Sequence, residues 1–363
     1  MKRLLIKNIS FLNFRNYESK HFKFYEKTNV IYGKNAIGKT NILEGIYYAL
    51  KGKSFKNAKD ENLVRQGYEV AKIEADILYG DLEENIEIEI KIDRKKKISV
   101  NETIVKSLKD MDDMYSVIVF EPDDINIIKL SSFYRRNFLD EIIEGINKEY
   151  RQYIINYNKA LDMRNYALKY DKNSSYYREK ILSSTMQILR YGSIIIYERN
   201  KMCKKLHNIA NVLYRQIEKT DENLEMIYQG SFFNEVYEIE NIKKNFYDEL
   251  RKTYKKDEFA GTTTIGPHKD DIIININDKN TRFFASQGQM RSVIITAKIA
   301  QKEILKKYSN KQSIVLLDDV FSELDDYRSN YLLDVLKDCQ SIITTVNKTN
   351  IFENKDISFI HLE

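Results

Sequence analysis

Proline, cysteine and tryptophan are scarce in this chain of 363 residues, which has two prolines, two cysteines and no tryptophan. With only twelve glycines as well, the chain contains no Pro/Gly/Ser linker and no low-complexity tract. Cys203 and Cys339 are isolated and lack the spacing of a metal site, which fits a reducing cytosol.

Long apolar runs are also missing. The N-terminus, MKRLLIKNISFLNFRNY, has too short an apolar run for a signal peptide. No window approaches the run of about 18 apolar residues that a membrane helix needs. We therefore expect a cytoplasmic protein without a membrane partner.

The overall composition is that of a globular protein, with 42% apolar and 31% charged residues, and the length suggests two or three domains. The formal net charge of +5 is a mild basic excess. This charge is compatible with nucleic-acid binding but does not establish it.

The most informative stretch is NVIYGKNAIGKTNILEGIYYAL at residues 29–50. An apolar run of β-formers precedes a match to G-x-x-x-x-G-K-[ST], and apolar residues then recur at helical spacing. Strand, loop and helix thus follow one another as a phosphate-binding loop requires. The alternative is a glycine-rich turn without a ligand, but the flanking strand and helix favour nucleoside triphosphate binding.

The residue types in this loop suit phosphate chemistry. Glycines let backbone N–H groups converge on phosphates, and the following helix adds its positive end. Lys39 can reach the β and γ phosphates, and the Thr40 hydroxyl can ligate Mg²⁺. The predicted loop residues are Gly33, Lys34, Asn35, Ala36, Ile37, Gly38, Lys39 and Thr40.

Antiparallel strands are predicted on both sides of the loop. Residues 4–14 indicate one strand or two joined by a bulge, and 21–24 alternate like a half-buried strand. Residues 70–105 alternate strongly, with KIDRKKK at 91–97 as a basic hairpin end.

From residue 131 the apolar period becomes helical and continues past residue 217. We predict that 131–255 form a helical lobe inserted between two parts of an ATPase head, 1–130 and 256–363. After the lobe, 272–276, 313–317 and 341–346 are predicted strands, and 293–304 lie in a predicted helix. Strands that alternate with helices predict a mostly parallel sheet.

The segment at 314–319, IVLLDD, has four apolar residues that end in two carboxylates. The carboxyl edge of a buried strand is where ligands bind in open α/β sheets. Asp318 can hold Mg²⁺ there, and Asp319 can orient or activate the attacking water. The alternative for Asp319 is a solvated carboxylate without a catalytic role.

Two weaker patterns carry no prediction. NKTN at 347–350 ends in Asn and so lacks the carboxylate that reads a guanine base. His207, His268 and His361 lie far apart in the sequence, without zinc or triad spacing, and His21 is predicted on an exposed strand face.

Together these motifs resemble the RecF family of bacterial recombination-mediator ATPases, which is related to the Rad50 and SMC group of ABC-type ATPases. The resemblance runs nearly from end to end. It rests on LNFRNY at 12–17, the loop ending in Lys39-Thr40-Asn41, RRNFLD at 135–140, GPHKDD at 266–271, SQGQ at 286–289 and LDDVFSELD at 317–325.

This resemblance implies an α/β, ABC-type P-loop ATPase head with an antiparallel β subdomain and an inserted helical lobe. It implies that Ser286, Gly288 and Gln289 belong to a signature motif that contacts the γ-phosphate of ATP held by a second subunit. Residues 322–325 are similar to a loop that couples the two sites. The implied mechanism is an ATP-dependent homodimer that clamps DNA, with Mg²⁺ as the metal and slow hydrolysis as the reset. The implied setting is replication-linked DNA repair and the SOS response, with other recombination mediator proteins as partners.

The chain departs from the family pattern at a few positions. Ala36 stands where relatives often have glycine, which is tolerable if its φ stays negative. Lys269 replaces an arginine and keeps the charge without the fork geometry. Thr344-Thr345 occupies the place of an expected histidine, and Gln66 and Glu121 are alternatives for the glutamine-loop residue. The inserted stretch of about 125 residues is too short for the long coiled-coil arms of Rad50 and SMC proteins.

Two other functions are possible on sequence grounds: an ABC transporter subunit, and an ATP-binding switch that acts on a protein without touching DNA. The antiparallel N-terminal half and the SQGQ variant argue against the transporter. Candidate DNA contacts are Lys51, Lys53, Lys56, Lys59, Arg94, Lys95, Lys96 and Lys97. Each cluster could equally be a solvated charged face, and Arg135 and Arg136 could instead pair with carboxylates inside the lobe. Single-stranded, duplex and gapped DNA are all possible ligands.

Overall fold

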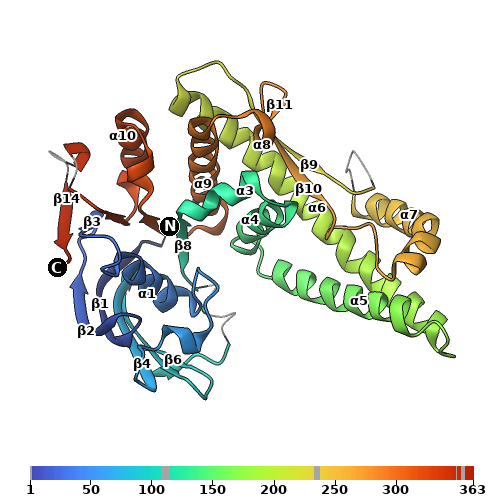
Figure 1. Cartoon of the computed structure of the whole chain (residues 1–363), viewed down its shortest axis with the longest axis horizontal. Helices are drawn as coiled ribbons and strands as arrows, with labels where there is room; N and C mark the ends of the chain where they lie inside the picture. The colour runs from blue at the N-terminus through green and yellow to red at the C-terminus, as the bar shows by residue number, and fades with distance from the viewer. Residues whose placement is uncertain (1, 108–110, 112–113, 233–237, 349, 353–355) are drawn as a thin grey trace. The chain divides into compact units, whose positions relative to one another are not determined.

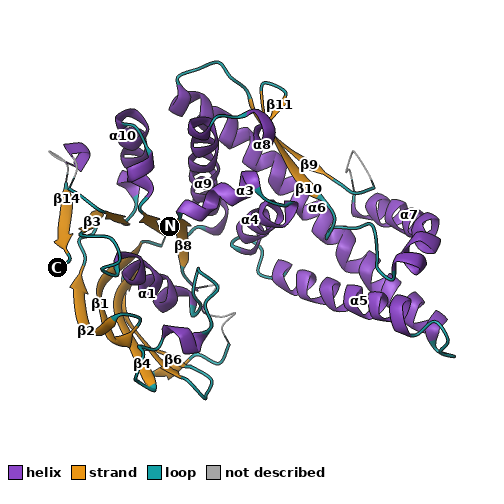
Figure 2. Ribbon diagram, in the orientation of Figure 1, coloured by secondary structure: helices purple, strands orange, loops and turns teal. Residues whose placement is uncertain are grey.

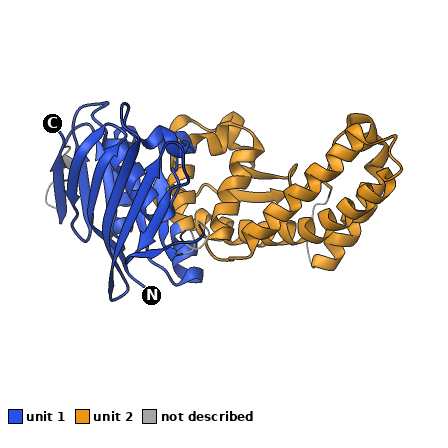
Figure 3. Cartoon of the chain, turned by 90° about the horizontal axis from the view of Figure 1, so that it is seen from below, with its two compact units in different colours: residues 1–124, 302–363 blue, residues 125–301 orange. Residues whose placement is uncertain are grey.

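The computed structural model describes residues 2–107, 111, 114–232, 238–348, 350–352 and 356–363. It divides into two compact units, which Figure 3 shows in different colours. Unit 1 comprises Met1–Asp124 and Lys302–Glu363, and unit 2 comprises Ile125–Gln301. No helix among the described residues is long and apolar enough to cross a membrane.

A parallel five-stranded sheet holds the carboxyl edge at which the site lies. Its order is β14-β3-β13-β12-β8, and every neighbouring pair is parallel. The strands are β3 (Thr28–Tyr32), β8 (Ser116–Phe120), β12 (Ser313–Asp318), β13 (Ser341–Thr345) and β14 (Ile357–His361). The predicted strands at 313–317 and 341–346 are confirmed, whereas β14 was not predicted.

An antiparallel six-stranded sheet forms the second layer of unit 1, in the order β2-β1-β4-β5-β6-β7. Its strands are β1 (Leu4–Phe14), β2 (Tyr17–Lys23), β4 (Val70–Tyr79), β5 (Leu82–Lys91), β6 (Lys97–Val100) and β7 (Thr103–Ile104). Of the two alternatives for residues 4–14, the structure has one continuous strand, whose pairing with β4 shifts register between Ile6 and Asn8 as at a bulge. The basic stretch at 91–97 joins β5 to β6, as predicted.

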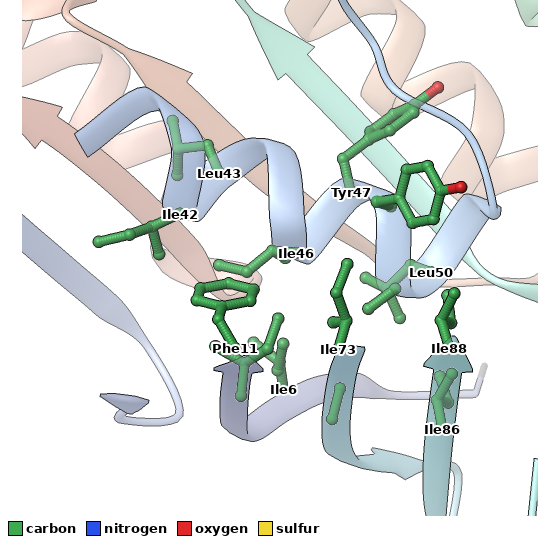
Figure 4. Packing of buried hydrophobic residues seen from close by; sticks show 14 of the residues in the cluster. Ile6, Phe11, Ile42, Leu43, Ile46, Tyr47, Leu50, Ile73, Ile86 and Ile88 are labelled. Atoms are coloured by element: carbon green, nitrogen blue, oxygen red, sulfur yellow. The ribbon is translucent and has the colours of Figure 1, made fainter. Parts of the chain in front are cut away.

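Helix α1 (Lys39–Lys51) packs within the core of unit 1, and Figure 4 shows its apolar face against β1, β4 and β5. Ile42, Ile46 and Leu50 are fully buried there, at the helical spacing that the sequence predicts. A Cβ on Gly45 would lie 2.3 Å from the Phe11 ring, so the missing side chain lets the helix approach β1 closely. The rest of unit 1 holds α10 (Asp326–Val335) and short 3₁₀ turns at Asp60–Leu63, Pro122–Ile125, Val320–Glu323, Leu336–Asp338 and Asn350–Phe352.

Unit 2 is built mainly of helices, coloured purple in Figure 2, with α6 in contact with both α5 and α7. Its helices are α3 (Asn126–Lys129), α4 (Ser132–Glu144), α5 (Tyr150–Tyr170), α6 (Tyr177–Glu218), α7 (Ile239–Ala260) and α8 (Thr281–Phe284), and α9 (Gln287–Ser309) begins in it. A small antiparallel sheet, β11-β10-β9, joins Leu224–Gln229 (β9), Asp271–Ile276 (β10) and Lys279–Asn280 (β11).

This small sheet corrects two expectations. Residues 224–229 were predicted within an all-helical stretch, and they form β9. Residues 272–276 were predicted with the parallel sheet, but β10 pairs with β9 instead, with Ile273 opposite Ile227. Because strands on both sides of the predicted boundary at residue 255 share one sheet, unit 2 extends to Gln301 rather than ending there.

Candidate nucleotide-binding site

The predicted phosphate loop lies between the carboxyl end of β3 and the first turn of α1, as its motif requires. Gly38 has a φ of 113°, a conformation that L side chains rarely adopt. A Cβ at this position would lie 2.4 Å from Nδ2 of Asn16. Only glycine therefore fits where the loop enters the helix.

Asn16 supports the loop from the turn between β1 and β2. Its Nδ2 donates to the Ile37 carbonyl oxygen at 2.8 Å, and its Oδ1 accepts from Asn41 Nδ2 at 2.9 Å. No role for Asn16 was predicted from the sequence. The sequence feature that could have indicated this role is the position of Asn16 in the LNFRNY motif.

Arg15, the neighbour of Asn16, anchors the same turn to α1. Its Nε and Nη2 donate to both carboxylate oxygens of Glu44, at 2.8 and 2.7 Å. Glu44 is fully buried, and the Ser54 hydroxyl donates a third hydrogen bond to it. A paired and hydrogen-bonded carboxylate is the form in which a charge can be buried at tolerable cost.

Lys39 is nearly buried, and its ammonium group is held by the loop backbone. Nζ donates to the carbonyl oxygens of Gly33 at 2.6 Å and Lys34 at 2.8 Å. Burial lowers the pKa of Lys39, while the carboxylates of Asp319 and Asp318 oppose that shift. The cation thus lies inside the loop with the acidic pair close enough to favour its charged form.

Ala36 does not have the negative φ expected from the sequence: its φ is 64°, in the left-handed region. For an L-residue this conformation costs roughly 1–2 kcal/mol. Alanine was expected to be tolerated here only with a negative φ, and that condition is not met. The loop therefore carries local strain at Ala36.

Thr40 and Asp318 meet across the site, from the start of α1 and the end of β12. The Thr40 hydroxyl donates to Asp318 Oδ1 at 2.8 Å. Thr344, at the end of β13, donates to the same oxygen at 2.8 Å and accepts from the Asp319 N–H at 3.1 Å. The position at which the resemblance led us to expect a histidine is thus occupied by a threonine that bonds to the acidic pair.

Asp319 follows β12 directly in a left-handed conformation, with a φ of 52°. Its Oδ1 is buried and has no hydrogen-bond partner among the described residues. Burial raises the pKa of this carboxyl, and the charge of Asp318 adds to the shift against the opposing effects of Ser322 and Lys39. A buried acceptor without a donor is uncommon in native structures, and a carboxyl oxygen in this state beside the phosphate loop is a candidate proton acceptor.

Glu121 lies at the same sheet edge as the acidic pair. Strand β8 pairs with β12 in register, with Phe120 opposite Leu317, so Glu121 and Asp318 follow at the same level. Gln66 is instead exposed in the connection that leads to β4. Of the two glutamine-loop alternatives, the topology favours Glu121.

In unit 2, Ser286 and Gln289 form a reciprocal cap at the start of α9. The Ser286 N–H donates to Gln289 Oε1 at 3.0 Å, and the Gln289 N–H donates to Ser286 Oγ at 3.2 Å. This is a capping box, in which two helix-end groups satisfy each other. The SQGQ segment, in which Ser286 and Gln287 are exposed, thus has a defined conformation at a helix N-terminus, which suits an anion.

Arg135 and Arg136 are both engaged inside unit 2, and Arg135 pairs with a carboxylate there, which was one of the two alternatives. Arg135 donates twice to Asp271, at 2.7 and 2.9 Å, and is buried. Arg136 donates to the Asp270 carbonyl oxygen at 2.7 Å. Both guanidinium groups therefore join the RRNFLD segment to GPHKDD.

Known proteins resemble this chain over nearly its whole length. The family model described as the RecF/RecN/SMC N terminal domain matches residues 5–361. A DNA replication and repair protein RecF of Clostridium novyi (strain NT) is 40% identical over 354 residues, 97% of this chain and 96% of the relative. The chain belongs to the RecF family.

Other RecF proteins and solved structures agree. RecF of Clostridium kluyveri is 39% identical over 94% of this chain and 92% of the relative. The solved structure of the recombination mediator protein RecF-ATPrS in the RecFOR pathway has a TM-score of 0.89 at 34% identity. It covers 99% of this chain and 96% of the solved one. An Smc head domain from Pyrococcus furiosus, at 15% identity and a TM-score of 0.57, shares the fold. These likenesses confirm the predicted α/β ATPase-head fold class.

The candidate DNA contacts of this RecF-family chain differ in their surroundings. Lys96 Nζ lies 3.0 Å from Asp60 Oδ2 and 5.0 Å from the Tyr48 ring centroid, and only 13% of its side chain is exposed. Lys59 is exposed but pairs with Glu61 at 3.5 Å. The exposed candidates in the β5–β6 connection and its border are Arg94, Lys95 and Lys97, and Lys53 and Lys56 are exposed after α1. For Lys96 the contacts favour a structural role.

Proposed function

We propose that this chain is an ATP-dependent recombination mediator that dimerises on ATP binding and clamps DNA. Its relatives are DNA replication and repair proteins RecF, and the solved structures similar to it include RecF-ATP. The observation that carries the proposal is the meeting of Lys39, Thr40, Asp318 and Asp319 at one sheet edge. Weak ATPase activity, with slow hydrolysis as the reset, is part of the proposal.

In the proposed site, ATP phosphates contact the backbone of residues 33–40. Lys39 exchanges its bonds to the Gly33 and Lys34 carbonyls for bonds to phosphate oxygens. The buried ammonium then pairs with an anion, which favours its charged form. Asp319 accepts a proton from the attacking water at its unpartnered Oδ1.

The residues also fit a magnesium ion. Mg²⁺ takes six oxygens at about 2.0–2.1 Å, which places neighbouring ligands roughly 2.9 Å apart. Thr40 Oγ1 and Asp318 Oδ1 are 2.8 Å apart. Both are hard oxygen donors, so these two residues would hold the ion. When bound, it would supply charge neutralisation on the phosphates.

The second half of the proposed site comes from another copy of the chain. Ser286, Gly288 and Gln289 would contact the γ-phosphate through the exposed start of α9. Because each copy offers a phosphate loop and a signature, two copies would enclose two nucleotides. The dimer would hold duplex, gapped or single-stranded DNA, with Lys51, Lys53, Lys56, Arg94, Lys95 and Lys97 as candidate contacts to phosphates, and Lys96 is left out because it pairs with Asp60.

Nucleotide binding is tested by titrating a fluorescent ATP analogue with Mg²⁺ against the wild type and Lys39→Met. We expect saturable binding that Lys39→Met weakens at least about tenfold, since methionine cannot donate a charge-assisted hydrogen bond to phosphate. Lys20→Met, on the exposed part of β2, is the matched control and should bind like the wild type. Equal binding by all three would contradict the proposed site.

DNA binding is tested separately, by salt titration of a labelled gapped duplex in the presence of ATP. Arg94→Gln combined with Lys95→Gln should weaken binding, because each substitution removes a cation that can neutralise a phosphate. The slope of log affinity against log salt should become shallower by about 0.9 for each duplex phosphate that is no longer neutralised. Lys20→Gln combined with Lys23→Gln removes the same charge from β2 and should change neither quantity.

If ATP binds but DNA binding is absent or insensitive to salt, the results favour the alternative function. That function is an ATP-binding switch working on a protein partner.

A further inference from the structure

Unit 2 contains a cavity of about 360 Å³ that the nucleotide site does not use. It lies along α6 and α7, with Arg164 of α5 in its lining, and Figure 1 shows these three helices. The volume falls within the range of about 300–1,000 Å³ that is typical of ligand sites. Its lining residues are Arg164, Arg178, Ile181, Leu182, Thr185, Tyr247, Leu250, Arg251 and Tyr254.

Three of the lining residues are arginines, and none of the lining residues is acidic. Arg178 and Arg251 are exposed, and no described carboxylate lies within ion-pair distance of either. Arg251 lies over the Tyr247 ring, with its guanidinium carbon 5.7 Å from the centroid. Stacking on an aromatic ring orients the planar guanidinium group of Arg251 before a ligand binds.

Arg164 is the buried member of the set, with 1% of its side chain exposed. Its Nη1 donates to Asp257 Oδ2 at 2.8 Å and to Thr263 Oγ1 at 2.6 Å. Its Nε is buried and has no hydrogen-bond partner among the described residues. An unsatisfied buried donor costs free energy, so a ligand that accepts a bond there would be favoured.

The remaining walls are largely apolar. Ile181, Leu182 and Leu250 line the cavity, and Leu182 is 63% exposed. The phosphates of a DNA backbone are charged and make no favourable apolar contacts with such walls. A ligand that carries both carboxylates and aliphatic side chains can form ion pairs with the arginines and apolar contacts with the leucines.

We propose that this cavity is a docking site for an acidic, apolar peptide segment of a partner protein. One carboxylate of the segment lies between Arg178 and Arg251, and an aliphatic side chain fills the space beside Leu182 and Leu250. This site is independent of the phosphate loop, so it is occupied with or without ATP.

The test is fluorescence anisotropy of the full chain with a labelled peptide in which aspartate and leucine alternate. A second peptide replaces aspartate with asparagine, and a third replaces leucine with serine. Arg178→Glu and Arg251→Glu reverse the charges at the cavity. Arg190→Glu is the matched control, because Arg190 is exposed on α6 outside the cavity and lies 5.4 Å over the Tyr191 ring as Arg251 does over Tyr247.

We expect saturable binding of the first peptide alone. It should be at least about tenfold weaker in Arg178→Glu and Arg251→Glu, and unchanged in Arg190→Glu. Thermal unfolding should be the same for all four proteins, since the mutated side chains are exposed. Three results would overturn the proposal: no saturable binding of the first peptide, equal weakening by Arg190→Glu, or weakening of gapped-duplex binding alone, which would assign these arginines to a nucleic-acid surface.

Discussion

Replacing Asp319 with asparagine is the sharpest single perturbation of the candidate site. Asparagine has the same shape and tolerates a left-handed backbone, so the φ of 52° should not change. The substitution removes the capacity to accept a proton, together with the negative charge that acts on Lys39. ATP affinity should therefore stay close to that of the wild type, because the contacts of Lys39 and Thr40 remain.

The expected effect on turnover follows from what a general base supplies. Proton transfer by a positioned side chain contributes about 10²–10⁴-fold, which corresponds to roughly 2.7–5.5 kcal/mol in the activation free energy. We thus expect Asp319→Asn to hydrolyse ATP at least about a hundredfold more slowly. Steady-state phosphate release and nucleotide titration, measured on the same preparation, separate the two effects.

The pH dependence gives an independent check on the same residue. Burial raises the pKa of Asp319 above its usual 3.8, and a base works only when it is deprotonated. The wild-type rate should therefore fall on acidification at a pH above the ordinary aspartate range. Asp338→Asn, which alters a carboxylate paired with Lys302 and Lys306, is the control and should keep this profile. Hydrolysis by Asp319→Asn within threefold of the wild type would refute the assignment.

Three further predictions concern the loop, its anchor and unit 2. Ala36→Gly should keep nucleotide binding, whereas Ala36→Val should weaken it several-fold in the same titration, because a β-branched residue is poorly accommodated at positive φ. Arg15→Met leaves the Glu44 carboxylate buried without its cation, so it should lower the free energy of unfolding, measured by urea denaturation, by about 3–5 kcal/mol. The double variant Arg15→Met with Glu44→Leu removes both charges and should recover much of that loss. Burial lowers the pKa of His268 from 6.5 to about 4. Between these two pH values the unfolded chain binds a proton at His268 that the folded chain does not, so the free energy of unfolding should decline as the pH falls from 6.5 to about 4. His268→Gln should flatten that decline in thermal unfolding measured at a series of pH values.

The parts of the site that could be predicted are those where local sequence dictates local backbone. Gly38 and Lys39 lie where the motif requires, because only glycine can enter α1 with that φ and that proximity to Asn16. Asp318 ends β12 and Asp319 follows it, and the four apolar residues before them fit a buried strand once the phosphate loop is recognised. Parallel pairing then brings both to the edge at which the loop lies.

The supporting contacts could not be predicted, because they join residues distant in sequence. Arg15 meets Glu44 and Thr344 meets Asp318 only after the sheets have formed. Lys96 appeared to be one more cation in a basic run, yet its pairing with Asp60 depends on where the β5–β6 connection falls. The strand at 224–229 was missed because its few alternating residues follow a long helical period and find their partner near residue 273.

The central claim is that ATP joins two copies of this chain through the phosphate loop of one and the α9 start of the other. Sedimentation velocity without nucleotide, with Mg-ATP, and with Mg-ATP and a short gapped duplex tests it directly. The wild type is compared with Lys39→Met, Ser286→Arg and Ser286→Asp, of which the last keeps the helix cap while adding a negative charge. We predict a monomer that becomes a dimer only with ATP, retains DNA as a dimer, and stays monomeric in all three variants. A wild-type protein that binds ATP but remains a monomer with and without DNA would contradict the account.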